Sequence, residues 1–512
     1  MAGIGTRSYE AKSTQVDQAG KPISCLYQND ANLGTKTQTF TWLDGTSHPG
    51  HRDPACTATL PNGGTTFDSA FPSSKPFDIN SYIRPSDTSC APGTLFSPTG
   101  VLAKTQDPVN GDPQGQPGGC TRDLVHRFYQ EQYQLDGGRQ DRYSTGSDAA
   151  GLTQGYYDTK SLPIYRFLHS EDAPKYVIAD HFFQAAFGGS YLNHQYLIAA
   201  RAPVWAAPPA GKNSQLDRAG FPNATYPLYA PQAGVTYNDG PLTQACPATP
   251  GVDSSGFPVD ANGRACGNYA VNTVQPANLP HGTGTPLPLI NDTDPNASNY
   301  ETNIGDELSA KHVSWAWFAG GWNDANAGHP DPLFQYHHQP FNYFANYAPG
   351  QPGRAHLKDE TDFTAAAKAG TLPSVSFVKP IGSENEHPGY ASTHNGENHL
   401  VSLVKAIEAG PQAKDTLIVV TYDEFGGQWD HVAPPGQGNN AGPHDSYGPG
   451  TRIPALLIGA PLHESGVDST SYDTTSILAT IEHKWHLAPL GARDKRVNAL
   501  THAFNLEDED DD

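Results

Sequence analysis

An α/β fold, with a mostly parallel sheet and helices on both of its faces, is predicted by two features of the sequence. Short apolar runs rich in Val, Ile and Leu alternate with segments of helical periodicity. Long stretches rich in Gly and Pro separate these elements and predict loop insertions. The chain also contains 24 Tyr, 20 Phe and 7 Trp, too many large apolar side chains for a disordered polypeptide. We therefore interpret the Gly- and Pro-rich stretches as loops of a globular protein.

Changes in composition divide the chain into three parts. Residues 1–120 consist mostly of turn-forming residues and are expected to be a loop-rich N-terminal part of the domain. The α/β domain proper is expected at 121–490, with a loop insertion at about 202–305. Residues 491–512 form a C-terminal segment that ends in an acidic tail.

In the first half, four elements are predicted before the insertion. Residues 121–134 (TRDLVHRFYQEQYQ) have a helical rhythm, and 160–169 give a second short helix. Residues 175–179 (KYVIA) predict a buried strand. In 180–200 a tight FGGS turn leads into a helix.

In the second half, apolar runs predict four strands and two helices. The strands are expected at 312–318, 373–378, 416–422 and 453–459, and the helices at 398–409 and 473–485. The run TLIVVTY at 416–422 is the clearest candidate for a strand buried on both faces. Since ligands bind beyond the carboxyl ends of parallel strands, the loops after these strands are where chemistry is expected.

The charge balance restricts the partners. With 31 Lys and Arg against 53 Asp and Glu, the formal charge is −22. This excess repels nucleic acid and anionic membranes, so neither is an expected partner. No stretch reaches transmembrane length, so no stable membrane insertion is expected. An anionic substrate requires local positive charge at the site, which a metal ion would supply.

Cysteine usage indicates the compartment. The six cysteines all lie in loop-like sequence within the first 266 residues: Cys25, Cys56, Cys90, Cys120, Cys246 and Cys266. An even number in such a setting favours disulfides and a secreted or periplasmic protein, with Cys246–Cys266 the first candidate pair; free buried thiols are the alternative. The sequence after Met1 has no apolar region of the kind found in a signal peptide, which conflicts with this interpretation.

The most informative stretch follows the best strand and reads TYDEFGGQWDH. A buried strand that ends in Asp423 and Glu424 places two repelling carboxylates at the functional edge of the sheet. A divalent cation is the usual compensation, so we predict a metal site there. The alternative is a strand end carrying solvated acids.

The second candidate site is AFGGSYLNH. Paired glycines before Ser190 present its hydroxyl at a helix N-terminus, where backbone N–H groups favour a phosphate. Ser190 is therefore a candidate metal-activated nucleophile and metal ligand. An ordinary helix N-cap serine is the alternative.

Histidines in three places complete the predicted site. They are able to neutralise phosphoryl oxygens or to protonate a leaving alkoxide, and they are His126, His337, His338 and His387. Lys379, directly after the run PSVSFV, is a further candidate for binding an anion.

Together these motifs resemble the bacterial phosphoesterase family, which contains acid phosphatase A and the phosphatidylcholine-type phospholipases C. The resemblance lies in four segments, namely TYDEFGGQWDHVAPP, FVKPIGSENEHPGY, SWAWFAGGW, and CTRDLVHRFYQEQYQ with its partner FGGSYLNH. It covers roughly residues 120–200 and 305–490 and implies an alkaline-phosphatase-like fold.

The resemblance also implies roles for individual residues. It places Ser190 at the nucleophile position and Asp423 and Glu424 at metal-ligand positions. The histidines that line the family's phosphate pocket correspond to His126, His337, His338 and His387. A serine nucleophile and a His-His pair are more similar to the acid phosphatase branch than to the phospholipase branch, in which threonine is usual. The sequence leaves the divalent metal open among Ca²⁺, Mg²⁺, Mn²⁺, Fe and Zn.

One departure from the family is expected to matter. Its members open with an apolar strand and a Glu-Asn motif that completes the metal site, and nothing of that kind precedes Gly20. We therefore expect the first strand and part of the metal site to be absent. Since a signal peptide is absent too, our hypothesis is a truncated or misassigned start, so the upstream coding sequence should contain all three features.

Three functions follow from these observations. The first is a phosphomonoesterase of acid phosphatase type, and the second is a phospholipase C acting on phospholipid head groups. The third is an inactive secreted binding protein on the same scaffold, since loss of metal ligands usually removes the metal.

Overall fold

The fold is given by a computed structural model. It describes residues 124–143, 153–156, 162–203, 289–296, 300–387 and 391–504 almost continuously, together with short pieces such as 15–16, 76–78, 248–252 and 258–259. The six cysteines, most of the predicted N-terminal part and most of the predicted 202–305 insertion lie outside these residues.

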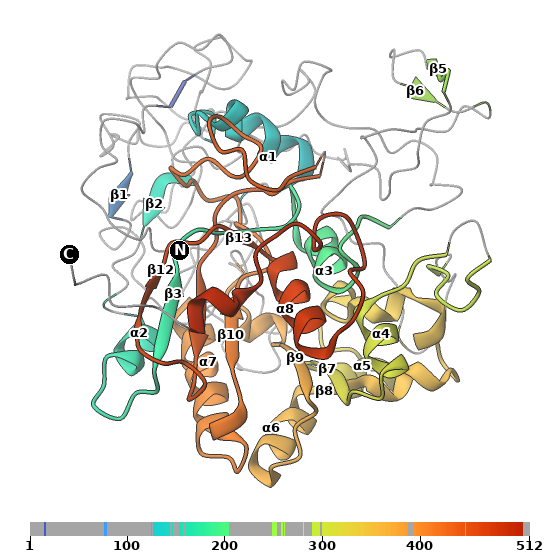
Figure 1. Ribbon diagram of the computed structural model, residues 1–512, viewed down its shortest axis with the longest axis vertical. Coiled ribbons are helices and arrows are strands. Elements are labelled where there is room, and N and C mark those ends of the chain that lie inside the picture. Colours follow the sequence, from blue (N-terminus) through green and yellow to red (C-terminus); the bar gives the residue numbers. More distant parts are fainter. Residues whose placement is uncertain are drawn as a thin grey trace, which may run out of the picture.

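Two sheets form the centre of the described structure (Figure 1). The first has the order β10 (Ile418–Thr421), β11 (Ala455–Ile458), β3 (Tyr176–Ala179), β12 (Gly466–Asp468). The second has the order β8 (Leu357–Asp359), β7 (Trp315–Ala319), β9 (Val375–Lys379) and is wholly parallel. In the first sheet β3 and β12 are parallel, whereas β11 runs antiparallel to both β10 and β3. Three of these five pairings are therefore parallel, and β11 is the exception to the predicted topology.

Three two-stranded pairings accompany the sheets. They join β1 (Phe77–Asp78) to β2 (Gly155–Tyr156), β4 (Phe182–Phe183) to β13 (Tyr472–Asp473), and β5 (Gly251–Val252) to β6 (Pro258–Val259). The described helices are α1 (Phe128–Leu135), α2 (Pro163–Leu168), α3 (Ser190–Ala199), α4 (Ile304–Ala310), α5 (Trp322–Asn326), α6 (Glu360–Ala369), α7 (Thr393–Glu408) and α8 (Thr475–Trp485).

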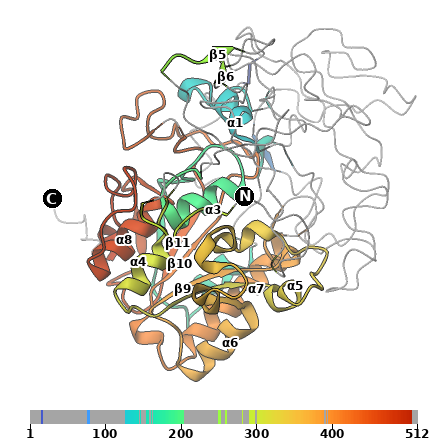
Figure 2. The same ribbon diagram turned by 90° about the vertical axis from the view of Figure 1, so that its right-hand side faces the viewer.

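Helices cover both faces of the sheets, as predicted. Along β7, Trp315, Trp317 and Ala319 join a core that includes residues of α3, α4 and α8. The alternating residues Ala316 and Phe318 pack on the opposite face, with Phe363 of α6 and Ile407 of α7. Figure 2 shows α4 and α8 on one side of the strands and α7 on the other. The α/β class predicted from the sequence is confirmed.

The prediction that TLIVVTY is fully buried is wrong. All four residues of β10 are only partly buried, whereas those of β11 are fully buried. The reason is position, since β10 is an edge strand whose one hydrogen-bonded neighbour among the described strands is β11. β9 is likewise an edge strand, of the second sheet. Ile418, the first residue of β10, packs against apolar clusters that belong to both sheets.

Helix boundaries differ from the predicted ones where local hydrogen bonds intervene. α1 begins at Phe128 rather than residue 121, because Arg127 is extended and the His126 side chain bonds to the Leu124 carbonyl. α6 was not predicted, although Asp359 and Asp362 form a capping box at its start. None of the helices in the described part of the chain is long and apolar enough to cross a membrane.

Two acids near the start of α4, the buried Asp292 and the half-buried Asp306, are held by amide and hydroxyl donors. Asp292 accepts a hydrogen bond from the Asn346 N–H at 2.8 Å, and Asp306 accepts one from the Tyr347 hydroxyl at 2.8 Å. Burial, together with the negative charge of Asp306, raises the pKa of Asp292 to about 7.

Replacing Asp292 by Asn should therefore change how stability depends on pH. Folded Asp292 holds its proton more tightly than the unfolded chain does, so its contribution to stability is complete below about pH 4 and is lost as the pH rises to about 7. The difference in melting temperature between Asp292→Asn and wild type should become more positive from about pH 5 to about pH 8. Asp294→Asn, on the exposed turn two residues away, is the control and should show the same difference at both pH values.

Candidate active site

The ends of β9 and β10 are joined by an ion pair. Lys379 is the last residue of β9, and its Nζ lies 3.0 Å from Oδ1 of Asp423, in the loop directly after β10. The two sheets therefore meet at the ends where the sequence predicted chemistry. Burial would raise the pKa of the Asp423 carboxyl, but the charges of Lys379 and His194 outweigh it and lower the pKa.

Ser190 lies beside this carboxylate. It is the first residue of α3, and the N-cap position belongs to Gly189, so the serine hydroxyl is not a helix cap. The Ser190 side chain is buried and close enough to Asp423 to contribute to lowering the pKa of that carboxyl. The ordinary capping role considered from the sequence does not apply.

His194 is a site residue that sequence reasoning missed. It lies one helical turn after Ser190, and its Nδ1 is 3.6 Å from Asp423 Oδ2 and 2.7 Å from the Ser190 carbonyl oxygen. Because a carbonyl only accepts hydrogen bonds, Nδ1 carries the proton. The signal was available in the sequence, because an i, i+4 spacing on a helix places two side chains on one face.

The predicted pair His337–His338 lies against His194. The His194 ring stacks on His338 at a centroid distance of 5.5 Å and meets His337 edge-on at 5.6 Å. Burial lowers the pKa of all three rings, that of His194 to about 4 with help from the charge of Lys379. Because the pKa values of these imidazoles lie below their ordinary range, the rings are neutral near neutral pH. Each ring then has one hydrogen-bond donor and one acceptor.

Glu424 occupies a second part of the site with the other two predicted histidines. Its Oε1 is 3.9 Å from Nε2 of His126, and its other oxygen accepts a hydrogen bond from the Gly426 N–H. The His126 and His387 rings meet edge-on at 5.5 Å. The structure thus brings every predicted site residue into one region, but Asp423 and Glu424 turn to different neighbours.

The residues around Asp423 fit one end of a hard-cation site. Asp423 Oδ2 is shielded from solvent, and no hydrogen bond to it is found within the described ranges. Together with the adjacent serine hydroxyl it offers oxygen donors of the kind that Ca²⁺, Mg²⁺ or Mn²⁺ prefers.

A second cluster of acidic residues, away from Asp423, is less suited to a metal ion. Glu360, Glu384 and His399 have potential ligand atoms within 4.8 Å of one another. However, the two His399 nitrogens face different carboxylates, Nε2 to Glu360 at 2.6 Å and Nδ1 to Glu384 at 3.4 Å. Hydrogen bonding and the charge of Glu360 raise the pKa of His399 against the lowering effect of burial, as expected for a protonated bridge between two acids.

Comparison with known proteins identifies the family. The model of the phosphoesterase family matches residues 65–488, which is most of the chain. This chain belongs to the phosphoesterase family. The match begins well upstream of residue 120, where the resemblance noted in the sequence starts.

Relatives with both expected activities share part of the chain. It is 29% identical to non-specific phospholipase C6 of Arabidopsis thaliana, over 27% of this chain and 30% of that protein. It is 29% identical to the non-hemolytic phospholipase C of Burkholderia pseudomallei, over 36% and 29%. A probable acid phosphatase of Kluyveromyces lactis is 26% identical over 39% and 45%. The chain thus spans less than half the length of each of these relatives.

A solved structure of an alkaline phosphatase superfamily protein from Vibrio parahaemolyticus also matches. It is 17% identical over 38% of this chain and 50% of that one, with a TM-score of 0.23.

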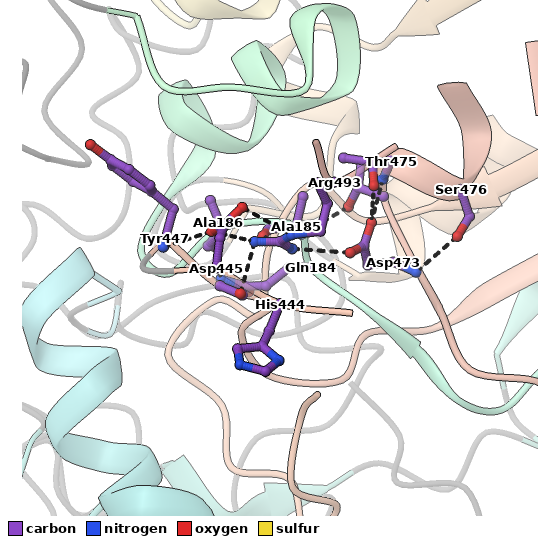
Figure 3. Close-up of polar contacts among 12 residues, drawn as sticks. Gln184, Ala185, Ala186, His444, Asp445, Tyr447, Asp473, Thr475, Ser476 and Arg493 are labelled. Atoms are coloured by element: carbon purple, nitrogen blue, oxygen red, sulfur yellow. Dashed lines mark hydrogen bonds and ion pairs between the residues drawn. The ribbon is translucent and has the colours of Figure 1, made fainter. Parts of the chain in front are cut away.

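In this member of the family the segment before Ser190 is supported by a buried arginine. Arg493 is almost inaccessible to solvent and donates to the Gly448 carbonyl. It also donates to the Ala185 carbonyl (Figure 3). Its charge is balanced by Asp473, also buried, at 3.0 Å and by Asp445 at 2.6 Å. Asn193 of α3 adds bonds to Ala186 on both its N–H and its carbonyl.

Removing this arginine should destabilise the whole domain. Arg493→Met leaves the buried Asp473 without its cation, and the expected loss in the free energy of unfolding is about 3–5 kcal/mol. Arg496→Met is the matched control, because Arg496 is exposed and bonds to the Ala492 and His444 carbonyls; its effect should stay within about 0.5 kcal/mol. Urea denaturation measures the free energy of unfolding of both variants. Equal losses would show that Arg493 stabilises the fold no more than an exposed arginine does.

Proposed function

We propose that this chain hydrolyses phosphate monoesters with Ser190 as the nucleophile. The observation that carries the proposal is the position of Ser190, whose hydroxyl is not used as a cap, lies at the start of α3 and is adjacent to Asp423. In the first step Ser190 Oγ forms a bond to phosphorus while the bond from phosphorus to the leaving oxygen breaks. Water then attacks the phosphoserine, releases phosphate and regenerates the hydroxyl.

The residues around Ser190 suit the charge that develops on the phosphoryl group. The N-terminus of α3 and the Lys379 ammonium provide positive potential, and the neutral His337 and His338 offer N–H donors to the oxygens. The proposal assigns protonation of the leaving alkoxide to His126, beside Glu424, and to His387, whose ring meets that of His126.

A divalent metal fits the same proposal. Asp423 and Ser190 would hold it, with Glu424 as a further ligand, and when bound it would lower the pKa of the serine hydroxyl. The identity of the metal follows from titrating the purified chain with Ca²⁺, Mg²⁺, Mn²⁺, Fe²⁺ and Zn²⁺ after chelation.

The substrate and the compartment belong to the proposal as well. We place the chain with the acid-phosphatase-like members because of its serine nucleophile and His-His pair; phosphatidylcholine hydrolysis is the competing activity. We further propose an extracytoplasmic location, supported by the even number of cysteines. A protein isolated with six reactive thiols from its native host would contradict that location.

Removing the nucleophile provides the direct test. Ser190→Ala should reduce kcat for p-nitrophenyl phosphate by roughly 10³-fold or more in the presence of the activating metal. Ser476→Ala is the matched control, since Ser476 is also buried near a helix start and its hydroxyl bonds to the Asp473 N–H. Full activity of Ser190→Ala would refute the assignment of Ser190 as the nucleophile.

The wild-type chain decides among the three functions. Faster turnover of p-nitrophenyl phosphate than of phosphatidylcholine supports the phosphomonoesterase, and the reverse supports a phospholipase C. A folded wild-type chain that hydrolyses neither substrate with any of these metals would indicate a binding protein.

Lys379 should contribute to anion binding. Lys379→Met removes the fixed cation nearest Asp423, so the inhibition constant for inorganic phosphate should rise about tenfold and kcat/KM should fall further. Lys379→Arg keeps the charge and should retain part of both. The readout is competitive inhibition by phosphate, and an unchanged inhibition constant in Lys379→Met would exclude a direct role.

A further inference from the structure

A completely buried glutamate lies behind the two loops of the site. Glu131 belongs to α1, which lies beyond one end of the strands (Figure 1). Its Oε2 accepts hydrogen bonds from the Gly188 N–H at 2.6 Å and from Gln184 Nε2 at 2.8 Å. Its Oε1 accepts bonds from the Thr451 N–H at 2.7 Å and the Thr451 hydroxyl at 2.8 Å. Four donors thus converge on one carboxyl group.

The residue type at this position follows from the donors. A carboxylate has two oxygens that only accept, whereas a glutamine would turn an amide N–H₂ against one pair of donors. Burial raises the pKa of Glu131, and the hydrogen bonds from Thr451 and Gly188 lower it, so these donors take the place of water and favour the ionised carboxylate.

Gln184 extends this network to the other loop of the site. While its Nε2 donates to Glu131, its Oε1 accepts a hydrogen bond from the Phe425 N–H at 2.7 Å. Phe425 directly follows Glu424, and Gly188 precedes Ser190 by two residues. The two side chains therefore connect the nucleophile turn to the carboxylate loop.

Gly188 has no freedom to compensate if this bond is lost. Its φ is +90°, and a Cβ at this position would lie 2.6 Å from the Phe128 nitrogen at the start of α1. The turn is thus fixed by close backbone packing against α1 and by the Glu131 carboxylate on the same helix.

We propose that Glu131, acting through Gln184, is a positioning residue that holds the Ser190 turn and the Asp423–Glu424 loop in register. Its effect on turnover rests on the function proposed above, whereas its effect on the loops does not. Within the described residues neither side chain forms a hydrogen bond with Ser190 or Asp423, so the role is structural support of the reacting groups.

Amide hydrogen exchange tests the coupling without relying on activity. In Glu131→Gln, exchange should rise about tenfold or more in peptides covering 184–190 and also in those covering 423–428, which Glu131 does not contact. In Gln184→Ala, the rise should be larger at 423–428, where the Phe425 N–H loses its acceptor, than at 184–190. The Ala186 and Gly188 carbonyls also lose Gln184 as a donor, but they keep Asn193, and the Gly188 N–H keeps its bond to Glu131. Exchange at 423–428 that stays at the wild-type level in both variants would overturn the proposal.

The control is a second buried glutamate with a similarly raised pKa. Glu482 of α8 is 5% exposed, has its pKa raised to about 8 by burial and accepts a bond from the Leu490 N–H. Glu482→Gln should leave both site peptides at their wild-type exchange. If Glu131→Gln does not fold, Gln184→Ala alone decides, since its effect at 423–428 is expected in a folded chain.

Turnover provides the second readout. Glu131→Gln and Gln184→Ala should each lower kcat by about 10²-fold with KM for p-nitrophenyl phosphate changed less than about threefold, and the double variant should lose less than the product of the two. An active wild type whose variants keep kcat would overturn the positioning role and leave the proposed function intact. An inactive wild type would refute the proposed function, and the exchange result would still decide the coupling.

Discussion

The site depends on keeping one desolvated carboxylate ionised at the junction of two sheets. Asp423 lies at the end of an edge strand, where burial alone would favour its neutral form. Lys379, on the facing edge strand of the other sheet, provides the opposing charge at 3.0 Å. A contact of this length fixes the relative position of β9 and β10 at their carboxyl ends, although the two strands are not hydrogen-bonded to each other in the described structure.

Burial, together with the charge of Lys379, keeps the neighbouring histidines neutral. A protonated His194 would meet the Lys379 ammonium in a region with little water, and this cost exceeds the attraction of Asp423. The same argument extends to His337 and His338, whose pKa values fall through burial and mutual repulsion. The cluster therefore offers several donors and acceptors but one fixed cation, an arrangement that suits a metal ion as the remaining source of positive charge.

Much of this was predictable from local sequence. Apolar runs located β3, β7, β9, β10 and β11, and the rule that ligands bind beyond strand ends led to Asp423 and Ser190. Burial of β10 was mispredicted, because an apolar run reports which residues avoid water but not how many strands flank them. The neighbours of a strand are fixed by pairing far along the chain.

The two residues that sequence reasoning missed differ in whether their partners lie nearby in the sequence. His194 lies one turn from Ser190 and had a local signal in the helical spacing. Glu131 had none, because its partners Gly188 and Thr451 are 57 and 320 residues away. A glutamate inside an amphipathic helix is indistinguishable from a surface residue until the donors around it are known.

The charge of the whole chain gives this local arrangement its importance. At −22 the protein repels a phosphate ester at long range, so capture cannot rely on its overall field. Beyond about 8 Å physiological salt screens exposed charges, and the attraction that remains comes from groups in contact with the phosphate. For the proposed phosphate ester, Lys379 and the first turn of α3 must then lie within hydrogen-bonding reach of the same phosphate. Tolerances of a few tenths of an ångström follow from that requirement, and only fully buried polar networks with every donor satisfied hold a loop so closely. The Glu131–Gln184 pair behind Ser190 and Arg493 beneath Ala185 are networks of this kind, which explains why buried polar and charged side chains lie behind the loops that carry Ser190 and Asp423.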